Sequence, residues 1–177
     1  MPFKNLIAFI AFSFFNCIAA SSFSQVVSIS LGLDGLTCPL CSRGVENSLK
    51  KLTFIEEITM DLENTSATIT FKPNSTVSYA EVIKKVFDAG FSTRFLIVRV
   101  NMAFMNQSSN KCLNYGGISY QIINSENSAF TGFINLQVID KDYMQVREFS
   151  KYAKTISESG TGCEDKNFRE VYNVIIL

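Results

Sequence analysis

The segment VSISLGLDGLTCPLC, residues 27–41, decides the first half of the fold. Over residues 27–33, apolar side chains alternate with small or polar ones, which indicates a strand with one buried face. Cys38 and Cys41 follow, with Pro39 directly after the first cysteine. If Cys38 is the N-cap of a helix, Pro39 takes the first helical position, where its fixed φ suits the helix and its missing N–H costs nothing. We therefore predict a strand, a cysteine-bearing loop and a helix.

The next 55 or so residues continue the alternation of strand and helix patterns. The first helix is expected to bury an apolar stripe, and two strands follow around the turn ENTS, residues 63–66. Apolar side chains that alternate along the first of these strands are Ile58, Met60 and Leu62, and along the second Ala67, Ile69 and Phe71.

A second helix begins at a capping box, because Ser78 lies three residues before Glu81. Its predicted buried stripe is Val82, Ile83, Val86 and Phe87. Gly90 ends this helix, and a fourth strand follows from Phe91. The order strand, helix, strand, strand, helix, strand predicts an α+β domain with a ferredoxin-like βαββαβ sandwich.

The stretch GLTCPLCSRGVENSLKKL, residues 35–52, resembles the GMTCxxC signature of heavy-metal-associated domains, which occur in copper chaperones, metal-pumping ATPases and mercury-binding proteins. The resemblance covers residues 26–98 of the domain that we place at residues 25–98, and Ala89-Gly90-Phe91 is similar to the family's GF or GY before its last strand. It implies a ferredoxin-like domain whose metal ligands are Cys38 and Cys41. The chain departs from the family at Leu36, where methionine is usual, and at Phe54, where glycine is usual; neither change removes a ligand.

Two thiolates at a helix start suit a soft cation that accepts two-coordinate sulfur ligation. Cu(I) is the first candidate, and Ag(I) or Hg(II) are imitators. Zn(II) fits less well, because structural zinc takes four ligands and the chain has no histidine. Thr37 stands where related zinc domains often carry an acidic residue, which also favours copper. The resemblance implies a metal-transfer partner such as a metal-transporting ATPase or an efflux component.

Three other interpretations of the Cys38 and Cys41 pair stay open. A thioredoxin-like redox couple also lies at a helix start, although the longer α/β pattern of that fold is missing here. A structural Cys38–Cys41 disulfide would close so small a loop that it restrains little of the chain. The third alternative is a domain that keeps the motif but serves only as an interaction module.

The amino terminus is typical of a secretory signal peptide, which we place at residues 1–24. Lys4 precedes an apolar run over residues 6–15, and small residues follow, so cleavage fits after residue 20, 22 or 24. Cys17 is an alternative lipid-anchoring site, but Asn16 before it fits such sites poorly. We therefore expect an exported protein, periplasmic or secreted, with no membrane-spanning segment after cleavage.

The composition excludes several classes of function. Lys plus Arg equals Asp plus Glu at 16 each, so no overall field favours nucleic acid. The absence of histidine excludes Ser-His-Asp and Cys-His mechanisms, and no catalytic cluster is recognisable. We expect a binding protein and not an enzyme.

Residues 99–177 predict a small, β-rich α+β domain of unknown role. The segments ISYQII, FINLQVI and VYNVIIL read as strands, and NQSSN, residues 106–110, reads as a loop. Apolar residues from Val146 to Ile156 mark a helix that ends near Gly160 and Gly162. Cys112 and Cys163 lie in this part, at the ends of predicted elements. Since the motif pair is committed to metal or to itself, we predict a Cys112–Cys163 disulfide in an oxidising compartment.

Overall fold

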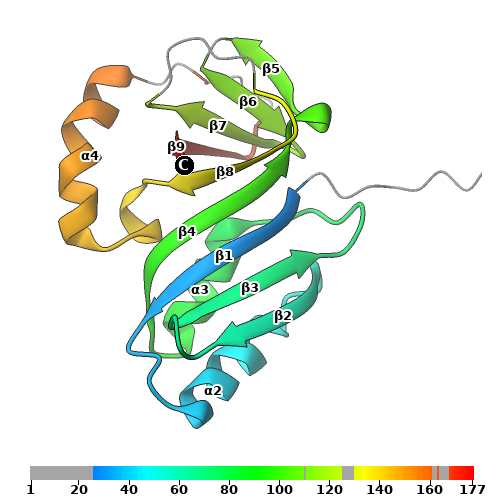
Figure 1. Ribbon diagram of the computed structural model, residues 1–177, viewed down its shortest axis with the longest axis vertical. Helices are drawn as coiled ribbons and strands as arrows, with labels where there is room; N and C mark the ends of the chain where they lie inside the picture. The colour runs from blue at the N-terminus through cyan, green and yellow to red at the C-terminus, as the bar shows by residue number, and fades with distance from the viewer. Residues whose placement is uncertain (1–25, 110, 125–129, 161–162, 164–167) are drawn as a thin grey trace, which may run out of the picture.

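The structure is a computed structural model that describes residues 26–109, 111–124, 130–160, 163 and 168–177. The predicted signal peptide and Cys17 lie outside the described residues. The described strands form one nine-stranded sheet in the order β2-β3-β1-β4-β8-β9-β7-β6-β5. In Figure 1, α2 and α3 lie against one face of the first four strands, and α4 lies beside the second half of the sheet.

The first half of the chain confirms the predicted ferredoxin-like order. Its elements are β1 (Val26–Asp34), α2 (Pro39–Leu49), β2 (Ile55–Asp61), β3 (Ser66–Phe71), α3 (Tyr79–Asp88) and β4 (Ser92–Asn101). All neighbouring strands in β2-β3-β1-β4 run antiparallel. The alternation read from β1 is real, because Ile29, Leu31 and Leu33 are fully buried against the helices.

The second half is β-rich α+β, as predicted. Its elements are η2 (Met102–Phe104), β5 (Asn106–Ser109), β6 (Cys112–Tyr115), β7 (Ile118–Ile122), β8 (Phe133–Val138), η3 (Lys141–Tyr143), α4 (Val146–Ser159) and β9 (Glu170–Ile176). Gly116 and Gly117 make the two-residue turn between β6 and β7, with φ of 57° and 82°. Glycine adopts positive φ without steric cost because it has no Cβ atom.

The prediction of a loop at NQSSN is wrong, because residues 106–109 form β5 at the edge of the sheet. This strand pairs antiparallel with β6, which supplies hydrogen-bond partners for its backbone groups. The polar sequence of the segment gave no sign of this pairing. Cys112 was expected just before a strand and instead begins β6.

Strand β4 joins the two halves of the molecule. It pairs with β1 along one edge and with β8 along the other, where Leu96 lies opposite Val138 and Val98 opposite Leu136. The boundary drawn between residues 98 and 99 therefore falls inside β4. The division into domains 25–98 and 99–177 stays a prediction, but the sheet passes through it without a break.

Helix α3 buries a different stripe from the one predicted. The capping box is present, since Ser78 Oγ accepts a hydrogen bond from the Glu81 N–H at 3.3 Å. Val82 and Val86 are fully buried, but Phe87 is 75% exposed, because the stripe that faces the sheet also includes Tyr79. The side chain of Leu62 is likewise 40% exposed, since β2 ends one residue earlier.

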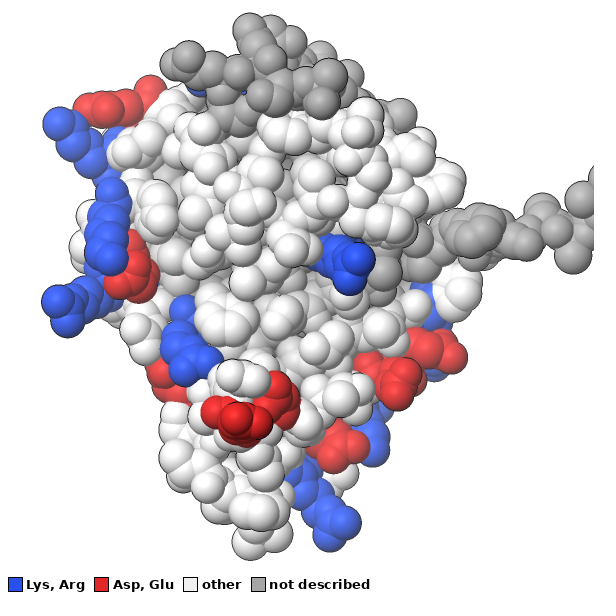
Figure 2. All heavy atoms as spheres, viewed as in Figure 1, with Lys and Arg blue, Asp and Glu red and all other residues white. Residues whose placement is uncertain are grey.

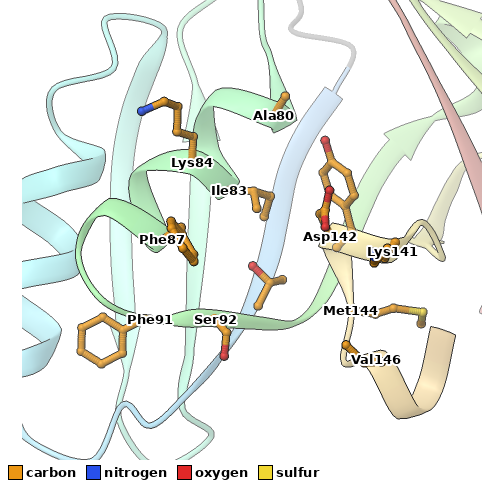
Figure 3. Close-up of a pocket in the computed structure, with 12 residues that line it drawn as sticks. Ala80, Ile83, Lys84, Phe87, Phe91, Ser92, Lys141, Asp142, Met144 and Val146 are labelled. Atoms are coloured by element: carbon orange, nitrogen blue, oxygen red, sulfur yellow. The ribbon is translucent and has the colours of Figure 1, made fainter. Parts of the chain in front are cut away.

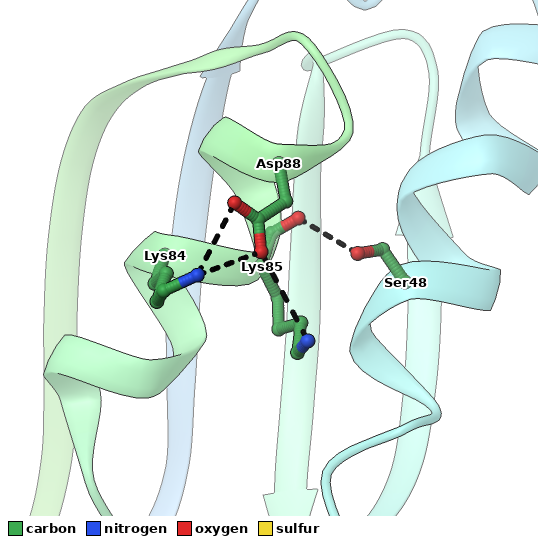
Figure 4. Close-up of polar contacts among 4 residues, drawn as sticks. All are labelled: Ser48, Lys84, Lys85 and Asp88. Atoms are coloured by element: carbon green, nitrogen blue, oxygen red, sulfur yellow. Dashed lines mark hydrogen bonds and ion pairs between the residues drawn. The ribbon is translucent and has the colours of Figure 1, made fainter.

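Polar contacts connect α2 to α3 on their outer side. The Ser48 hydroxyl on α2 donates to the Lys85 carbonyl oxygen on α3 at 2.8 Å (Figure 4). Asp88 pairs with Lys84 at 3.1 Å and with Lys85 at 3.9 Å on the last turn of α3. These ion pairs are exposed and contribute little individually, whereas the Ser48 contact crosses between helices and fixes their relative position.

A cluster of four tyrosines packs the second half of the sheet against the start of α3. The Tyr79 and Tyr120 hydroxyl oxygens lie 2.7 Å apart, and both side chains are fully buried. The Tyr79 and Tyr172 ring centroids are 5.4 Å apart, and the Tyr143 hydroxyl donates to the Tyr172 hydroxyl at 3.1 Å. Glu170 accepts hydrogen bonds from Tyr172 at 2.8 Å and from Ser78, the N-cap of α3, at 2.6 Å. Strand β9 therefore helps to hold the first turn of α3.

We expect Tyr120→Phe to lower the free energy of unfolding by about 1–3 kcal/mol, because it leaves the buried Tyr79 hydroxyl without a partner. The double variant with Tyr79→Phe should cost less than the sum of the two single changes, since no polar group is then stranded. Urea unfolding of the four proteins measures this coupling. Additive costs would contradict it.

The same pair predicts a loss of stability at alkaline pH. Burial is the main cause that raises the pKa of Tyr79 and Tyr120 well above the ordinary tyrosine value. The folded state therefore keeps protons that the unfolded chain releases above about pH 10. Their stabilising effect is complete below that pH and falls as pH rises, by about 1.4 kcal/mol per pH unit for each tyrosine. Unfolding measured between pH 9 and 11 should show stability falling as pH rises, and the fall should be less steep in the double phenylalanine variant, where Tyr143 and Tyr172 still contribute.

Candidate metal centre

The two motif cysteines lie together at the amino terminus of α2. Cys38 is the N-cap, in an extended conformation with φ −133° and ψ 148°, and Pro39 is the first helical residue, as predicted. Cys38 Sγ accepts a hydrogen bond from the Cys41 N–H at 3.0 Å. In the structure the two cysteines form a disulfide, with their Cα atoms 5.2 Å apart. The disulfide places both sulfur atoms side by side at the start of α2.

The loop around the cysteines has one buried side and one exposed side. Leu36 is fully buried beneath it, which is the position where the resemblance expects methionine. Both cysteines are half-buried, and Cys41 packs against the core. Leu40, between them, is 80% exposed. An incoming molecule can therefore approach the pair from the side of Leu40.

The electrostatic setting favours thiolates. Unpaired N–H groups at a helix start carry partial positive charge, which stabilises an anion there. The first turn of α2 contains no acidic residue that would oppose this effect. Across the described part of the chain, no cluster of three or more cysteine, aspartate or glutamate side chains could hold a metal ion. The candidate centre thus offers two sulfur donors, which is the donor set of a two-coordinate soft cation.

A side chain from the second half of the chain contacts the segment ahead of the cysteines. Gln145 Nε2 lies 3.0 Å from both carboxylate oxygens of Asp34, the last residue of β1. Gln145 is the residue before α4, so this hydrogen bond connects the cysteine loop with the second half of the sheet. The two residues are 111 positions apart, and no pattern in the sequence pairs them.

A groove of about 440 Å³ opens beside the same contact, between α3 and the start of α4. Figure 3 shows Ile83 and Phe87 of α3 on one side, Met144 and Val146 on the other, and Phe91 at one end. The Thr93 hydroxyl also belongs to the lining, and it is buried with no hydrogen-bond partner among the described residues. Phe87 lines this groove and is exposed there. The helix periodicity had predicted that its side chain would lie in the core.

Cys112 and Cys163 are the predicted second pair, and both come well after α2 in the sequence. The structure joins them with Cα atoms 5.7 Å apart, within the range that a disulfide requires. Cys112 begins β6, and Cys163 lies in the connection between α4 and β9. Both side chains are buried. This pair lies in the second half of the molecule and adds no ligand to the α2 centre.

On the face drawn in Figure 2, basic and acidic residues lie mixed along the left side and over the lower part, and neither sign gathers into one patch. This agrees with the equal numbers of basic and acidic residues in the chain. In the ranges that the structure describes, no helix has the length and apolar character needed to cross a membrane.

Comparisons with known proteins match the first half of the chain. Residues 31–92 match the heavy-metal-associated domain family. A copper-transporting ATPase of Helicobacter pylori is 32% identical over 77 residues, which cover 44% of this chain and 10% of the ATPase. The chain thus matches only about a tenth of the length of such relatives.

Among solved structures, the CopZ metallochaperone is 21% identical, with a TM-score of 0.35; the match covers 37% of this chain and 97% of that one. A copper-binding domain of a P-type ATPase is 30% identical, with the same TM-score, and the match covers 38% and 89% of the two chains. The sequence motif, the order of the elements and the family match agree on one assignment. Residues 31–92 of this chain are a heavy-metal-associated domain.

Proposed function

We propose that this chain is an exported protein that binds Cu(I) through the thiolates of Cys38 and Cys41 and buffers it or passes it on. The observation that carries the proposal is the cysteine pair at the start of α2, inside a heavy-metal-associated domain. Ag(I) and Hg(II) share the preference for sulfur and would bind in its place. Export rests on the leader-like residues 1–24, which lie outside the described part of the chain.

The low coordination number of Cu(I) between two thiolates would allow the ion to be transferred to a partner. Two thiolates leave open positions around Cu(I), so a thiolate of a partner can add before one of the first two leaves. The exposed side of the loop, at Leu40, is where such a partner has access. We propose a metal-transporting ATPase or an efflux component as the partner, because the relatives that match this domain are named copper-transporting ATPases. The role is binding and not catalysis.

The disulfide between Cys38 and Cys41 supports one alternative, a redox or interaction module that binds no metal. Metal binding needs this bond reduced by two electrons, with a thiol reductant becoming oxidised in its place. The alternatives therefore differ in what the reduced protein does. A metal-binding protein holds Cu(I) tightly once reduced, whereas a redox module exchanges disulfides with or without copper.

We expect the reduced protein to bind one Cu(I) per chain, and Cys38→Ser or Cys41→Ser to abolish tight binding. Zn(II) should bind far more weakly, because zinc needs further ligands that the α2 start does not supply. Competition against chromophoric chelators under anaerobic conditions measures both affinities. The matched control is Cys112→Ser, which removes a thiol outside the motif. Unchanged copper affinity in the Cys38 and Cys41 double variant would refute the proposal.

We also propose that Cys112 and Cys163 form a structural disulfide in the exported protein. The bond closes a loop with a sequence separation of 51, so on the chain-entropy model it stabilises the fold by roughly 2–4 kcal/mol. Cys112→Ser should lower the melting temperature of the oxidised protein and leave the copper stoichiometry unchanged. Mass spectrometry of the oxidised wild-type protein should find no free thiol at Cys112 or Cys163; two free thiols would show that the bond does not form.

A further inference from the structure

We propose that the groove between α3 and the start of α4 is a binding site for a small, neutral aromatic molecule that carries a hydroxyl or carbonyl oxygen, with the Thr93 hydroxyl as the hydrogen-bond partner of that oxygen. The described lining residues do not include Cys38 or Cys41, so the inference is independent of the proposed metal binding. The two halves of the chain each supply one wall of this site.

The floor of the groove holds a polar atom without a partner. Among the described residues, the Thr93 hydroxyl oxygen is the one buried side-chain nitrogen or oxygen that lacks a hydrogen bond, and the residue is only 7% exposed. Thr93 pairs with Leu33, whose side chain is fully buried on the helix side of the sheet, so Thr93 points to that side as well. A buried hydroxyl without a partner costs free energy, and native proteins contain few of them. A ligand that binds this hydroxyl would recover that cost.

The walls of the groove are apolar and partly aromatic. Ile83 and Phe87, four residues apart on one side of α3, form one wall, and Met144 and Val146 form the other (Figure 3). Phe91 lies at one end. The volume of about 440 Å³ is in the range of small-molecule sites, which are mostly apolar and contain a few polar groups that fix the orientation of the ligand. Phenylalanine rings and a methionine sulfur both pack favourably against a flat ring, which favours an aromatic ligand.

The walls can adapt to a ligand. The Thr93 oxygen has almost no surface open to solvent in the free protein, so a ligand has to turn wall side chains aside to reach it. Two of these side chains are held by few contacts, since Phe87 is 75% and Val146 is 69% exposed. Exposed side chains change rotamer within nanoseconds, so the groove can close around a ring without a change in the backbone.

The charges at the groove favour a neutral ligand. Lys84 pairs with Asp88 at 3.1 Å, and Lys141 is followed directly by Asp142, so neither sign prevails around the opening. A charged ligand would lose hydration in an apolar groove without gaining a full counter-charge, whereas a hydroxyl or carbonyl oxygen is satisfied by one hydrogen bond. A threonine hydroxyl both donates and accepts, so Thr93 suits either kind of oxygen.

The test uses phenol and toluene, which have nearly the same shape and differ in a hydroxyl against a methyl group. NMR titration of the full chain measures the affinity of both probes for wild type, Thr93→Val and Thr93→Ser. We expect phenol to bind the wild type with a dissociation constant of about 1 mM, within the range for a ligand of about seven non-hydrogen atoms. Thr93→Val should lower the ratio of phenol affinity to toluene affinity about fivefold, as expected for the loss of one hydrogen bond, and Thr93→Ser should preserve the ratio.

The stability of the free protein gives a second measurement, with the opposite sign. Because valine removes a buried hydroxyl that has no partner, Thr93→Val should raise the melting temperature by about 2–4 °C while it weakens phenol binding. The matched control is Thr68→Val, the same change at an exposed position of β3, which should alter neither affinity. Phe87→Ala removes part of one wall and should weaken the binding of both probes.

Phenol binding that does not saturate at about ten times the expected dissociation constant overturns the proposal. So does an affinity ratio that Thr93→Val leaves unchanged, or a set of shifted resonances that lies outside the groove. A lower melting temperature of Thr93→Val would show that the hydroxyl serves the fold, which also contradicts the proposal. Cys38→Ser and Cys41→Ser should bind both probes as the wild type does, so a failure of this site and a failure of copper binding are distinguishable.

Discussion

The pairing of β4 on both of its edges is the constraint on which the rest of the structure depends. By its topology, the first half of the chain alone would end with β4 as an edge strand, with a row of unpaired backbone groups. Here β8 occupies that edge and β4 becomes a central strand of a nine-stranded sheet. Leu96, Val98 and Val100 on this strand are all fully buried. The heavy-metal-associated domain and the rest of the chain therefore share a backbone hydrogen-bond ladder.

This shared strand places the second half of the chain against α3. Once β8 is paired with β4, β9 and β7 follow in the sheet and carry Tyr172 and Tyr120 to the buried start of that helix. Buried hydroxyls need partners, and each of these finds one within the cluster. Glu170 then reaches the N-cap of α3. Strand β9, the last of the described strands, thereby contributes to a helix in the first half of the chain.

The same packing brings the second half to the cysteine loop. The segment that leads into α4 passes the end of β1, where Gln145 meets Asp34. The cysteines themselves need only local structure, because Cys38 caps α2 and Cys41 lies in its first turn. Asp34, four residues ahead of Cys38, instead meets a residue from the second half of the chain.

The sequence alone was sufficient for what depends on near neighbours. Alternation in β1, proline after the N-cap cysteine, the Ser78 capping box and the motif between Gly35 and Cys41 are local signals, and each appears in the structure as predicted. Tertiary structure decided whatever needs a partner from elsewhere. Phe87 and Val86 are equally apolar, but only packing could determine that one faces a groove and the other the core. Residues 106–109 became a strand because β6 was there to pair with them. The contact of Gln145 with Asp34 joins residues 111 positions apart, so the energy that selects it belongs to the folded sheet and leaves no periodic trace in the chain.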